Sequence, residues 1–435
     1  MYDVPRGFCL IPWIHAHVTA QGRRKLCCVD SINLGDAPVS ADSNLKDYWN
    51  SEEMKQVRRQ MLAGELLQRC NNCSQHSIRA VTYRDQMLAR WHDWIGPAIA
   101  ATSADGSTSL EPFTFDYRSS TCNLKCRICG PRYSTTLEME IRRNPELQQF
   151  DPDPMLWGKG YMEARSSAQS IARDELLAAA RAGTIRHLYW AGGEPLFDET
   201  HWSVMNELVR TGNARHVDVV YNTNLTMLKF KGQTVADIWP HFPHVTVQAS
   251  IDGVGAAGEY IRSGFSTAHF SENMDALAAM AQQSPTIAIV LDVTLTSLGL
   301  LHLGDLLQFA VDRRLGVTSK LMFPRKVTNF MAVEFLPQAV KDDWCRRWMD
   351  WIIRNDHEKL LDALYDTLDI ALRRRSFDAA TVAAGAGSIT VFEKTRGDQH
   401  TYRKLLEVDD RLVNFLPIAE TAAREQNIAL AQHSP

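Results

Sequence analysis

The chain has 435 residues, of which 45% are hydrophobic and 23% are charged, the composition of a globular protein with a buried core. The formal net charge of -4 gives no electrostatic reason to expect a nucleic-acid partner, and no apolar run approaches the ~20 residues of a membrane span. The first residues lack the basic and apolar regions of a secretory signal. We therefore expect a soluble cytoplasmic protein that contacts neither nucleic acid nor membrane.

The cysteines are the most informative part of the composition. There are nine, and eight of them precede residue 130 in two groups. The groups are Cys9, Cys27, Cys28, Cys70 and Cys73, followed by Cys122, Cys126 and Cys129. In a chain without a secretory signal, metal or redox chemistry explains such groups better than disulfides do. The sequence therefore predicts two metal sites.

Along the chain, residues 1–100 carry the first cysteine group and are expected to form one module. Within them, the apolar residues of 45–66 recur at three- and four-residue spacing, which predicts a helix. Residues 101–112 are small and polar, which indicates a linker to the next part of the chain.

From residue 113 onward, apolar strand-like runs alternate with helical segments, as in βαβ units around a parallel sheet. The expected strands are 113–118, 185–191, 216–222, 244–251, 286–295 and 316–322. This number of strands predicts an α/β fold with a partial (β/α)6 barrel over 113–325 rather than a full barrel. A helical C-terminal region is expected over 326–435.

The second cysteine group has the spacing C-x3-C-x2-C, with Cys122, Cys126 and Cys129 on the loop after the first barrel strand. Three thiolates on one loop can each bind one iron of a [4Fe-4S] cubane and leave the fourth iron without a protein ligand. The amino and carboxylate groups of S-adenosylmethionine (SAM) can chelate that iron. The alternative is a structural zinc site, but zinc needs four ligands and no fourth Cys or His stands nearby in the sequence.

The second expected strand ends in a glycine-rich turn. Its residues are Gly192, Gly193, Glu194 and Pro195. Parallel barrels collect ligand groups at the C-terminal ends of their strands, and glycines let the backbone come close to a ligand. At this place the turn is expected to hold the amino group of SAM.

The third and fourth strands end in polar side chains. Asn224 follows the third strand, and Gln248, Ser250 and Asp252 alternate along the fourth, which places these three on one face. Polar groups at a strand mouth suit ribose hydroxyls or the methionyl carboxylate. Asn and Asp also cap turns often, so both roles remain open.

With these motifs the chain resembles the radical SAM superfamily, in its twitch/SPASM-like subfamily. TCNLKCRICG and AGGEP match the first two motifs of the superfamily, and 250–264 is similar to its fourth-strand region. The resemblance implies a partial (β/α)6 radical SAM barrel, a SAM-binding [4Fe-4S] cluster, SAM as cosubstrate, and contact of Arg262 with SAM. It also implies an external reductant such as flavodoxin or ferredoxin. No adenine motif is visible on the fifth strand, so adenine contacts from 290–300 stay unassigned.

The first cysteine group offers four thiolates, from Cys9, Cys70, Cys73 and one of Cys27 and Cys28. Four thiolates suit either zinc or an iron–sulfur cluster with no open iron, and the spacing does not choose. The stretch FCLIPWIHAHVTAQGRRKLCC and the later C-x2-C resemble twitch or SPASM modules, which implies an auxiliary [4Fe-4S] cluster. Such a cluster would relay electrons or serve a structural role.

The last cysteine, Cys345, lies at the edge of an apolar helical stripe that includes Trp344 and Trp348. One interpretation is a small residue of the core, as free cysteines commonly are. The other is a thiol that donates a hydrogen atom to a substrate radical, as in peptide epimerases of the superfamily.

The resemblance also favours a class of substrate. Radical SAM proteins with auxiliary clusters often modify ribosomally made peptides, so a peptide is the first hypothesis, with epimerisation, oxidation or cross-linking as outcomes. A carbohydrate or another small molecule is the second. A non-enzymatic electron carrier is the third, but a carrier has no use for three thiolates with an open iron.

Overall fold

The structure is a computed structural model. It describes residues 4–31, 44–74, 82–144, 147, 156–324, 328–397 and 399–422. The chain divides into two compact units, each treated separately below. The first unit comprises 1–120, 154–221 and 233–245, and the second comprises 121–153, 222–232 and 246–435. The stretch predicted as the barrel, 113–325, therefore contributes to both units.

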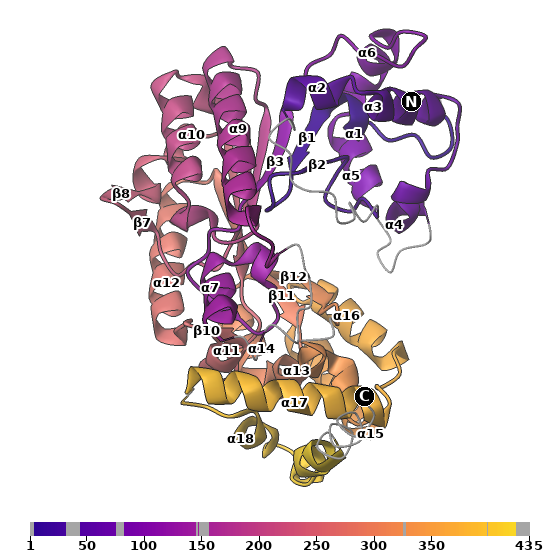
Figure 1. The fold of residues 1–435 in the computed structure, drawn as a ribbon. Helices are drawn as coiled ribbons and strands as arrows, with labels where there is room; N and C mark the ends of the chain where they lie inside the picture. Colours follow the sequence, from indigo (N-terminus) through magenta and orange to yellow (C-terminus); the bar gives the residue numbers. More distant parts are fainter. Residues whose placement is uncertain are drawn as a thin grey trace. The chain divides into compact units, whose positions relative to one another are not determined.

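The first unit contains the N-terminal helices and the first strands of the sheet. Its helices are α1 (Ile11–Ile14), α2 (Leu45–Trp49), α3 (Glu52–Leu62), α4 (Asn71–Ser74), α5 (Tyr83–Arg90), α6 (Ile95–Ala100), α9 (Tyr161–Ala182) and α10 (Glu199–Arg210). Its strands are β1 (His15–Val18), β2 (Arg24–Lys25), β3 (Thr114–Arg118), β5 (His187–Ala191) and β8 (Gln233–Thr234). The helices α9 and α10 lie side by side (Figure 1).

The predicted helix of 45–66 is present as α2 and α3. The Ser51 side chain accepts a hydrogen bond from the Met54 amide and so begins α3. Met54, Val57 and Met61 then face inward at helical spacing and are buried in the core of the N-terminal region.

The stretch predicted as a linker packs against these helices. Trp49 Nε1 donates to the Leu110 carbonyl at 2.7 Å, and Trp13 Nε1 donates to Thr102 Oγ1 at 2.7 Å. Gly106 has φ +87, and a Cβ there would lie 2.2 Å from the Lys55 carbonyl oxygen. Small residues are therefore needed in this stretch because it lies directly on α3.

In the sheet of the first unit, β1 joins the strands predicted for the barrel. It pairs antiparallel with β2 and parallel with β3, with His15 opposite Thr114 and His17 opposite Asp116. β3 pairs parallel with β5, and β5 with β6 (Asp218–Thr223). A strand from the predicted auxiliary module thus extends the sheet, an arrangement that the sequence analysis did not predict.

The second unit contains the remaining strands and the C-terminal helices. Its strands are β4 (Lys125–Cys126), β7 (Lys229–Phe230), β10 (Arg262–Ser263), β11 (Ile287–Leu295) and β12 (Gly316–Leu321), and most of β9 (His244–Ser250) belongs to it. Its helices up to residue 312 are α7 (Thr135–Arg143), α11 (Gly255–Ile261), α12 (Thr267–Gln283), α13 (Ser297–Leu301) and α14 (Leu303–Asp312). β11 and β12 pair parallel from Val290 opposite Gly316 to Leu295 opposite Leu321.

The strands β3, β5 and β6 are neighbours in chain order, and so are β9, β11 and β12. Neighbouring strands in chain order are typical of a (β/α) barrel, whereas doubly wound sheets reverse their order. The predicted α/β fold with a mostly parallel sheet is therefore confirmed. Among the described helices, none has both the length and the apolar character needed to cross a membrane.

The predicted helical C-terminal region is also confirmed. It contains α15 (Gln338–Asn355), α16 (Asp362–Arg373), α17 (Ala379–Arg396) and α18 (Tyr402–Leu406). The first half of α17, residues 379–388, consists mostly of small residues, which let that helix approach its neighbours closely. At Gly385, for example, a Cβ would lie 2.7 Å from atoms of Asn329 and Phe335.

Candidate functional site

The three-cysteine loop lies in the second unit and is held by a short pair of strands. β4 pairs antiparallel with β10, with Cys126 opposite Arg262. The Cys129 amide donates to the Cys126 carbonyl at 3.1 Å, which folds the loop back on itself. The Cys122 amide donates to Thr135 Oγ1 at 3.3 Å, at the start of α7. Local hydrogen bonds therefore fix the backbone of all three cysteines.

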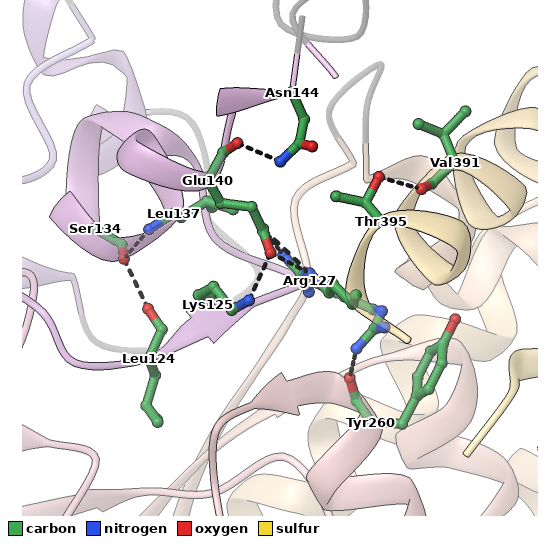
Figure 2. Close-up of polar contacts among 11 residues, drawn as sticks. Leu124, Lys125, Arg127, Ser134, Leu137, Glu140, Asn144, Tyr260, Val391 and Thr395 are labelled. Atoms are coloured by element: carbon green, nitrogen blue, oxygen red, sulfur yellow. Dashed lines mark hydrogen bonds and ion pairs between the residues drawn. The ribbon is translucent and has the colours of Figure 1, made fainter. Parts of the chain in front are cut away.

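Charged residues on either side of Cys126 anchor this loop (Figure 2). Lys125 Nζ donates to Glu140 Oε1 of α7 at 2.6 Å, and Arg396 of α17 donates to the same carboxylate at 2.7 Å. The Arg127 amide donates to the Ile261 carbonyl at 2.8 Å. Three helices and a strand thus converge on the loop that carries the thiols.

The neighbourhood of Arg127 is unusual because its guanidinium is buried. It donates to the Tyr260 carbonyl and lies over the Tyr260 ring, 3.7 Å from the ring centroid (Figure 2). A cation over an aromatic face is stabilised by the ring quadrupole, the more so away from water. This contact ties the loop to the end of α11, which leads directly into β10.

An ion pair lies beside Cys126. Arg262 Nε is 2.8 Å from Asp252 Oδ2, and both side chains are buried. Burial by itself lowers the pKa of Arg262, but the Asp252 carboxylate and the Cys126 thiolate raise it above its usual value. Burial raises the pKa of Cys126 to about 12, and Arg262 opposes that rise. Arg262 therefore favours the thiolate form, which is the form that binds iron.

Two predicted strand-end residues approach this loop within the second unit. Asn224 Nδ2 donates to Asn123 Oδ1 at 3.0 Å, and Asn123 lies between Cys122 and Cys126 in the sequence. Asp252 Oδ2 pairs with Arg262, which stands opposite Cys126, while its Oδ1 accepts the Thr294 amide at 2.9 Å. The polar ends of β6 and β9 are thus placed near the three-cysteine loop.

Gln248 and Ser250 lie on β9 with partly buried side chains, alternating with the fully buried Val247 and Ala249. They therefore share the face opposite to the apolar one, as predicted from the alternation.

Asp292 is a candidate residue that the sequence analysis missed. Its carboxylate accepts Lys320 Nζ at 2.7 and 2.8 Å and Asn222 Nδ2 at 2.8 Å. It lies on β11 in the region where adenine contacts were left unassigned. An acidic residue inside the mostly apolar run of 287–295 was the signal available in the sequence.

The glycine-rich turn belongs to the first unit. Gly192 and Gly193 have φ of +71 and +52, and a Cβ on Gly192 would lie 2.9 Å from the Ser119 carbonyl oxygen. Glu194 is fully buried, and its Oε1 accepts the Leu196 amide at 3.0 Å, just after Pro195. The glycines are therefore required for the turn to pass close to the end of β3.

Four cysteines of the first group line one cavity of the first unit. They are Cys9, Cys27, Cys70 and Cys73. Apolar residues and two arginines complete the lining, and Cys28 is not among the described residues that form it. Burial raises the pKa of Cys9 to about 12 and that of Cys27 well above its usual value. Four thiols around one cavity fit a metal or cluster that needs four thiolates.

An ion pair holds the two cysteine-bearing segments together. Arg69, next to Cys70, donates through Nε to Asp30 Oδ2 at 3.2 Å. Asp30 also accepts the Leu26 amide at 3.3 Å, and so spans the turn that carries Cys27. Because Arg69 and Asp30 are both buried, this pair is expected to fix the distance between the two segments.

Cys28 does not line this cavity, although Cys73, which does, also raises its pKa. Burial raises its pKa to about 11, and the largest charged influences on it are Asp116, which raises the pKa, and Arg118, which lowers it. Both of those residues belong to β3. The side chains of consecutive residues in an extended or turn backbone point in different directions. Of the two neighbouring cysteines, therefore, Cys27 faces the cavity and Cys28 does not.

Cys345 is fully buried in α15 of the second unit. Burial raises its pKa to about 12, and the charged groups that influence it, including Lys341 and Arg346, lie on the same helix. The Trp344 and Trp348 rings of the predicted stripe are 5.6 Å apart. The packing role considered from the sequence accounts for these surroundings.

Comparison with known proteins identifies one part of the chain. Residues 9–74 match the SPASM family, described as an iron-sulfur cluster-binding domain. The match spans the four cysteines that line the cavity. No curated protein matches the chain.

Solved structures show remote similarity. Native anSMEcpe with bound AdoMet is 14% identical, with a TM-score of 0.36, over 56% of this chain and 61% of that one. Streptococcus suis SuiB bound to S-adenosylmethionine is 12% identical, with a TM-score of 0.35, over 73% and 64%. SuiB bound to precursor peptide SuiA is 10% identical, with a TM-score of 0.34, over 72% and 64%. The chain thus matches less than two thirds of each of these proteins.

Proposed function

We propose that this protein is a radical SAM enzyme with an auxiliary [4Fe-4S] cluster. The observation that carries the proposal is the loop of Cys122, Cys126 and Cys129, with Arg262 and Asp252 beside it. Three cysteines held by backbone hydrogen bonds provide three thiolates and no fourth. A [4Fe-4S] cluster on three thiolates supplies, when SAM is bound, the electron that cleaves SAM to methionine and a 5′-deoxyadenosyl radical.

The residues around the loop fit that cluster and a charged cosubstrate. Arg262 carries a buried positive charge next to Cys126 and so compensates the negative charge of a thiolate-ligated cluster. Asp252 holds the Arg262 guanidinium in place. We infer that Arg262 and Asp252 orient the methionyl group of SAM.

The other predicted SAM contacts are assigned from the places of their residues at the ends of strands. Asn224 is bonded to Asn123 of the cysteine loop and directly follows the end of β6. Gln248 and Ser250 share a polar face of β9 and are assigned to the ribose hydroxyls. The turn of Gly192 and Gly193 provides a backbone without side chains for the SAM amino group.

For the auxiliary cluster, we propose Cys9, Cys27, Cys70 and Cys73 as ligands. The support is their common cavity and the match of 9–74 to an iron-sulfur cluster-binding domain. The same four thiolates could bind zinc instead. Analysis of iron and inorganic sulfide distinguishes the two, because a zinc site contains neither.

A ribosomally synthesised peptide is the proposed substrate, with abstraction of a hydrogen atom as the first chemical step. The support is the resemblance of the N-terminal module to those of peptide-modifying radical SAM proteins. A solved structure of SuiB holds precursor peptide SuiA, but its similarity to this chain is too remote to carry the substrate over. A carbohydrate or other small-molecule substrate is the competing proposal, and a short precursor gene beside this one would decide between them.

The reaction outcome depends on what quenches the substrate radical. Epimerisation with Cys345 as hydrogen donor requires its thiol to reach the substrate, and the complete burial of Cys345 supports a packing role instead. Oxidation or cross-linking needs no such donor. The variant Cys345→Ala tests this point, because only an epimerase with Cys345 as donor would lose its product and still cleave SAM.

The proposed function is tested on the anaerobically reconstituted protein. The wild type should hold about eight irons and produce 5′-deoxyadenosine with reductant and SAM, whereas Cys126→Ala should hold about four irons and produce none. The spectrum of the reduced wild-type protein should change when SAM is added, and that of Cys126→Ala should not. Retained 5′-deoxyadenosine formation in Cys126→Ala would refute the site.

A further inference from the structure

A set of buried metal-binding side chains lies on β1 and β3, outside the lining of the four-cysteine cavity. His15 and His17 are alternate residues of β1 and therefore share one face of the sheet. The parallel register puts Asp116 of β3 opposite His17. All three side chains are buried, with 4%, 3% and 1% of their surface exposed. One possible ligand atom from each lies within 4.8 Å of the others.

The hydrogen bonds of His15 fix which of its nitrogens carries the proton. Thr114 Oγ1 donates its only hydrogen to the Ile14 carbonyl at 3.0 Å. It therefore accepts from His15 Nδ1, which is 2.8 Å away. His15 Nε2 then carries a lone pair, and burial, which lowers the pKa of His15 to about 4, keeps the ring neutral.

That lone pair is buried and has no hydrogen-bond partner among the described residues. Buried polar atoms are nearly always paired with protein, water or an ion, so an unpaired acceptor at this place calls for an occupant. A metal-binding histidine has this arrangement: one nitrogen fixed by a hydrogen bond and the other turned toward the metal.

The carboxylate of Asp116 supplies a negative charge beside the two histidines. Arg118 donates to it through Nε at 3.1 Å and through a terminal nitrogen at 3.2 Å. Burial by itself raises the pKa of Asp116, but Arg118 and the histidines hold it well below its usual range. His17 Nδ1 lies 2.8 Å from Asp116 Oδ2, without the alignment of a hydrogen bond. Asp116 is therefore ionised and close to both imidazoles.

We propose that His15, His17 and Asp116 form a binding site for one divalent transition-metal ion, such as Zn²⁺. Two imidazoles and one carboxylate are ligands that such ions prefer, whereas Mg²⁺ and Ca²⁺ prefer oxygen alone. The site lies next to the four-cysteine cavity, because Tyr83, which lines that cavity, packs edge-on against His15 with ring centroids 6.4 Å apart. It is independent of the proposed radical chemistry.

The test uses the protein with both clusters already reconstituted, so that the seven cysteines proposed as cluster ligands are occupied before zinc is added. Equilibrium dialysis against Zn²⁺ should then give about one tightly bound zinc per chain, the stoichiometry of a single site. His15→Gln, His17→Gln and Asp116→Asn should each weaken zinc binding at least about 10-fold, the usual effect of perturbing a metal site. The exposed His241→Gln is the matched control and should bind zinc like the wild type.

Iron and sulfide are counted in every sample, so that loss of zinc is separated from loss of the clusters. Unchanged zinc binding in all three variants, or no zinc in the wild type, would overturn the proposal. A second measurement needs no variant: the zinc X-ray absorption edge of the wild type should show nitrogen and oxygen neighbours. Sulfur neighbours would place the metal on cysteines and also overturn it.

Discussion

Arg262 Nε lies 2.8 Å from Asp252 Oδ2, and Arg262 stands opposite Cys126 across the short strand pair β4–β10. One member of this ion pair is therefore the direct strand partner of Cys126, a proposed cluster ligand. Both charges are removed from water, and each is tolerated because the other is present.

The first prediction concerns this pair. Asp252→Asn keeps the acceptor for the Thr294 amide but leaves Arg262 as an uncompensated buried charge, so we expect the free energy of unfolding to fall by about 3–5 kcal/mol. Denaturant unfolding of the reconstituted protein measures this. Asp343→Asn, which removes a carboxylate from the exposed Arg411, is the matched control and should change stability little. Equal effects of the two substitutions would contradict the prediction.

The second prediction separates the neighbouring cysteines. Cys27→Ser should lower the iron content from about eight to about four per chain, because Cys27 lines the four-cysteine cavity. Cys28→Ser should keep all the iron, because Cys28 does not line that cavity. Iron and sulfide analysis after anaerobic reconstitution decides the matter, and the opposite pattern would assign the ligand to Cys28.

The third prediction concerns the anchor of the three-cysteine loop. Glu140 accepts a hydrogen bond from Lys125 (Figure 2). It accepts another from Arg396, whose side chain is only 1% exposed. Glu140→Gln removes the countercharge, and we expect it to destabilise the protein by about 2 kcal/mol, the range of hydrogen bonds to charged groups. Cluster iron should also be released faster to a chelator. Glu207→Gln, at a carboxylate that likewise contacts two arginines but whose partners Arg181 and Arg210 are both exposed, should do neither.

The fourth prediction is a pH dependence. His201 is fully buried, its Nε2 lies 2.9 Å from the Tyr221 hydroxyl, and burial lowers its pKa from 6.5 to about 3. Between those values the unfolded chain binds the proton and the folded chain does not, so stability falls as the pH falls below 6.5. Above pH 6.5 both states are neutral at this residue, and no dependence arises from it.

Replacing this histidine isolates its contribution. Between pH 7 and pH 5, the wild type should lose about 2 kcal/mol more stability than His201→Gln, since each pKa unit corresponds to about 1.4 kcal/mol. Unfolding curves at the two pH values, compared between wild type and variant, measure the difference. Parallel losses in both proteins would show that His201 is protonated in the folded state.

Much of the fold could be predicted from the sequence, and the main site was proposed from it. The alternation of apolar runs and helical segments determined the α/β class, because burial on both faces of a parallel strand requires such runs. The positions of the expected strands agree with those observed, as at β3 (Thr114–Arg118) within 113–118. The three cysteines were recognisable because all of them lie on one short loop, where spacing alone limits the geometry.

Contacts between distant segments were decided by the tertiary structure alone. Nothing in the local pattern tells Cys27 from its neighbour, since the choice depends on which thiol faces Cys9 and Cys70 from another part of the chain. Likewise, the pairing of β1 with β3 brings His15 and His17 to Asp116, about a hundred residues away. Spacing within a segment determines which side chains share a face. The pairing and register between segments determine which residues lie against that face, and local spacing does not encode them.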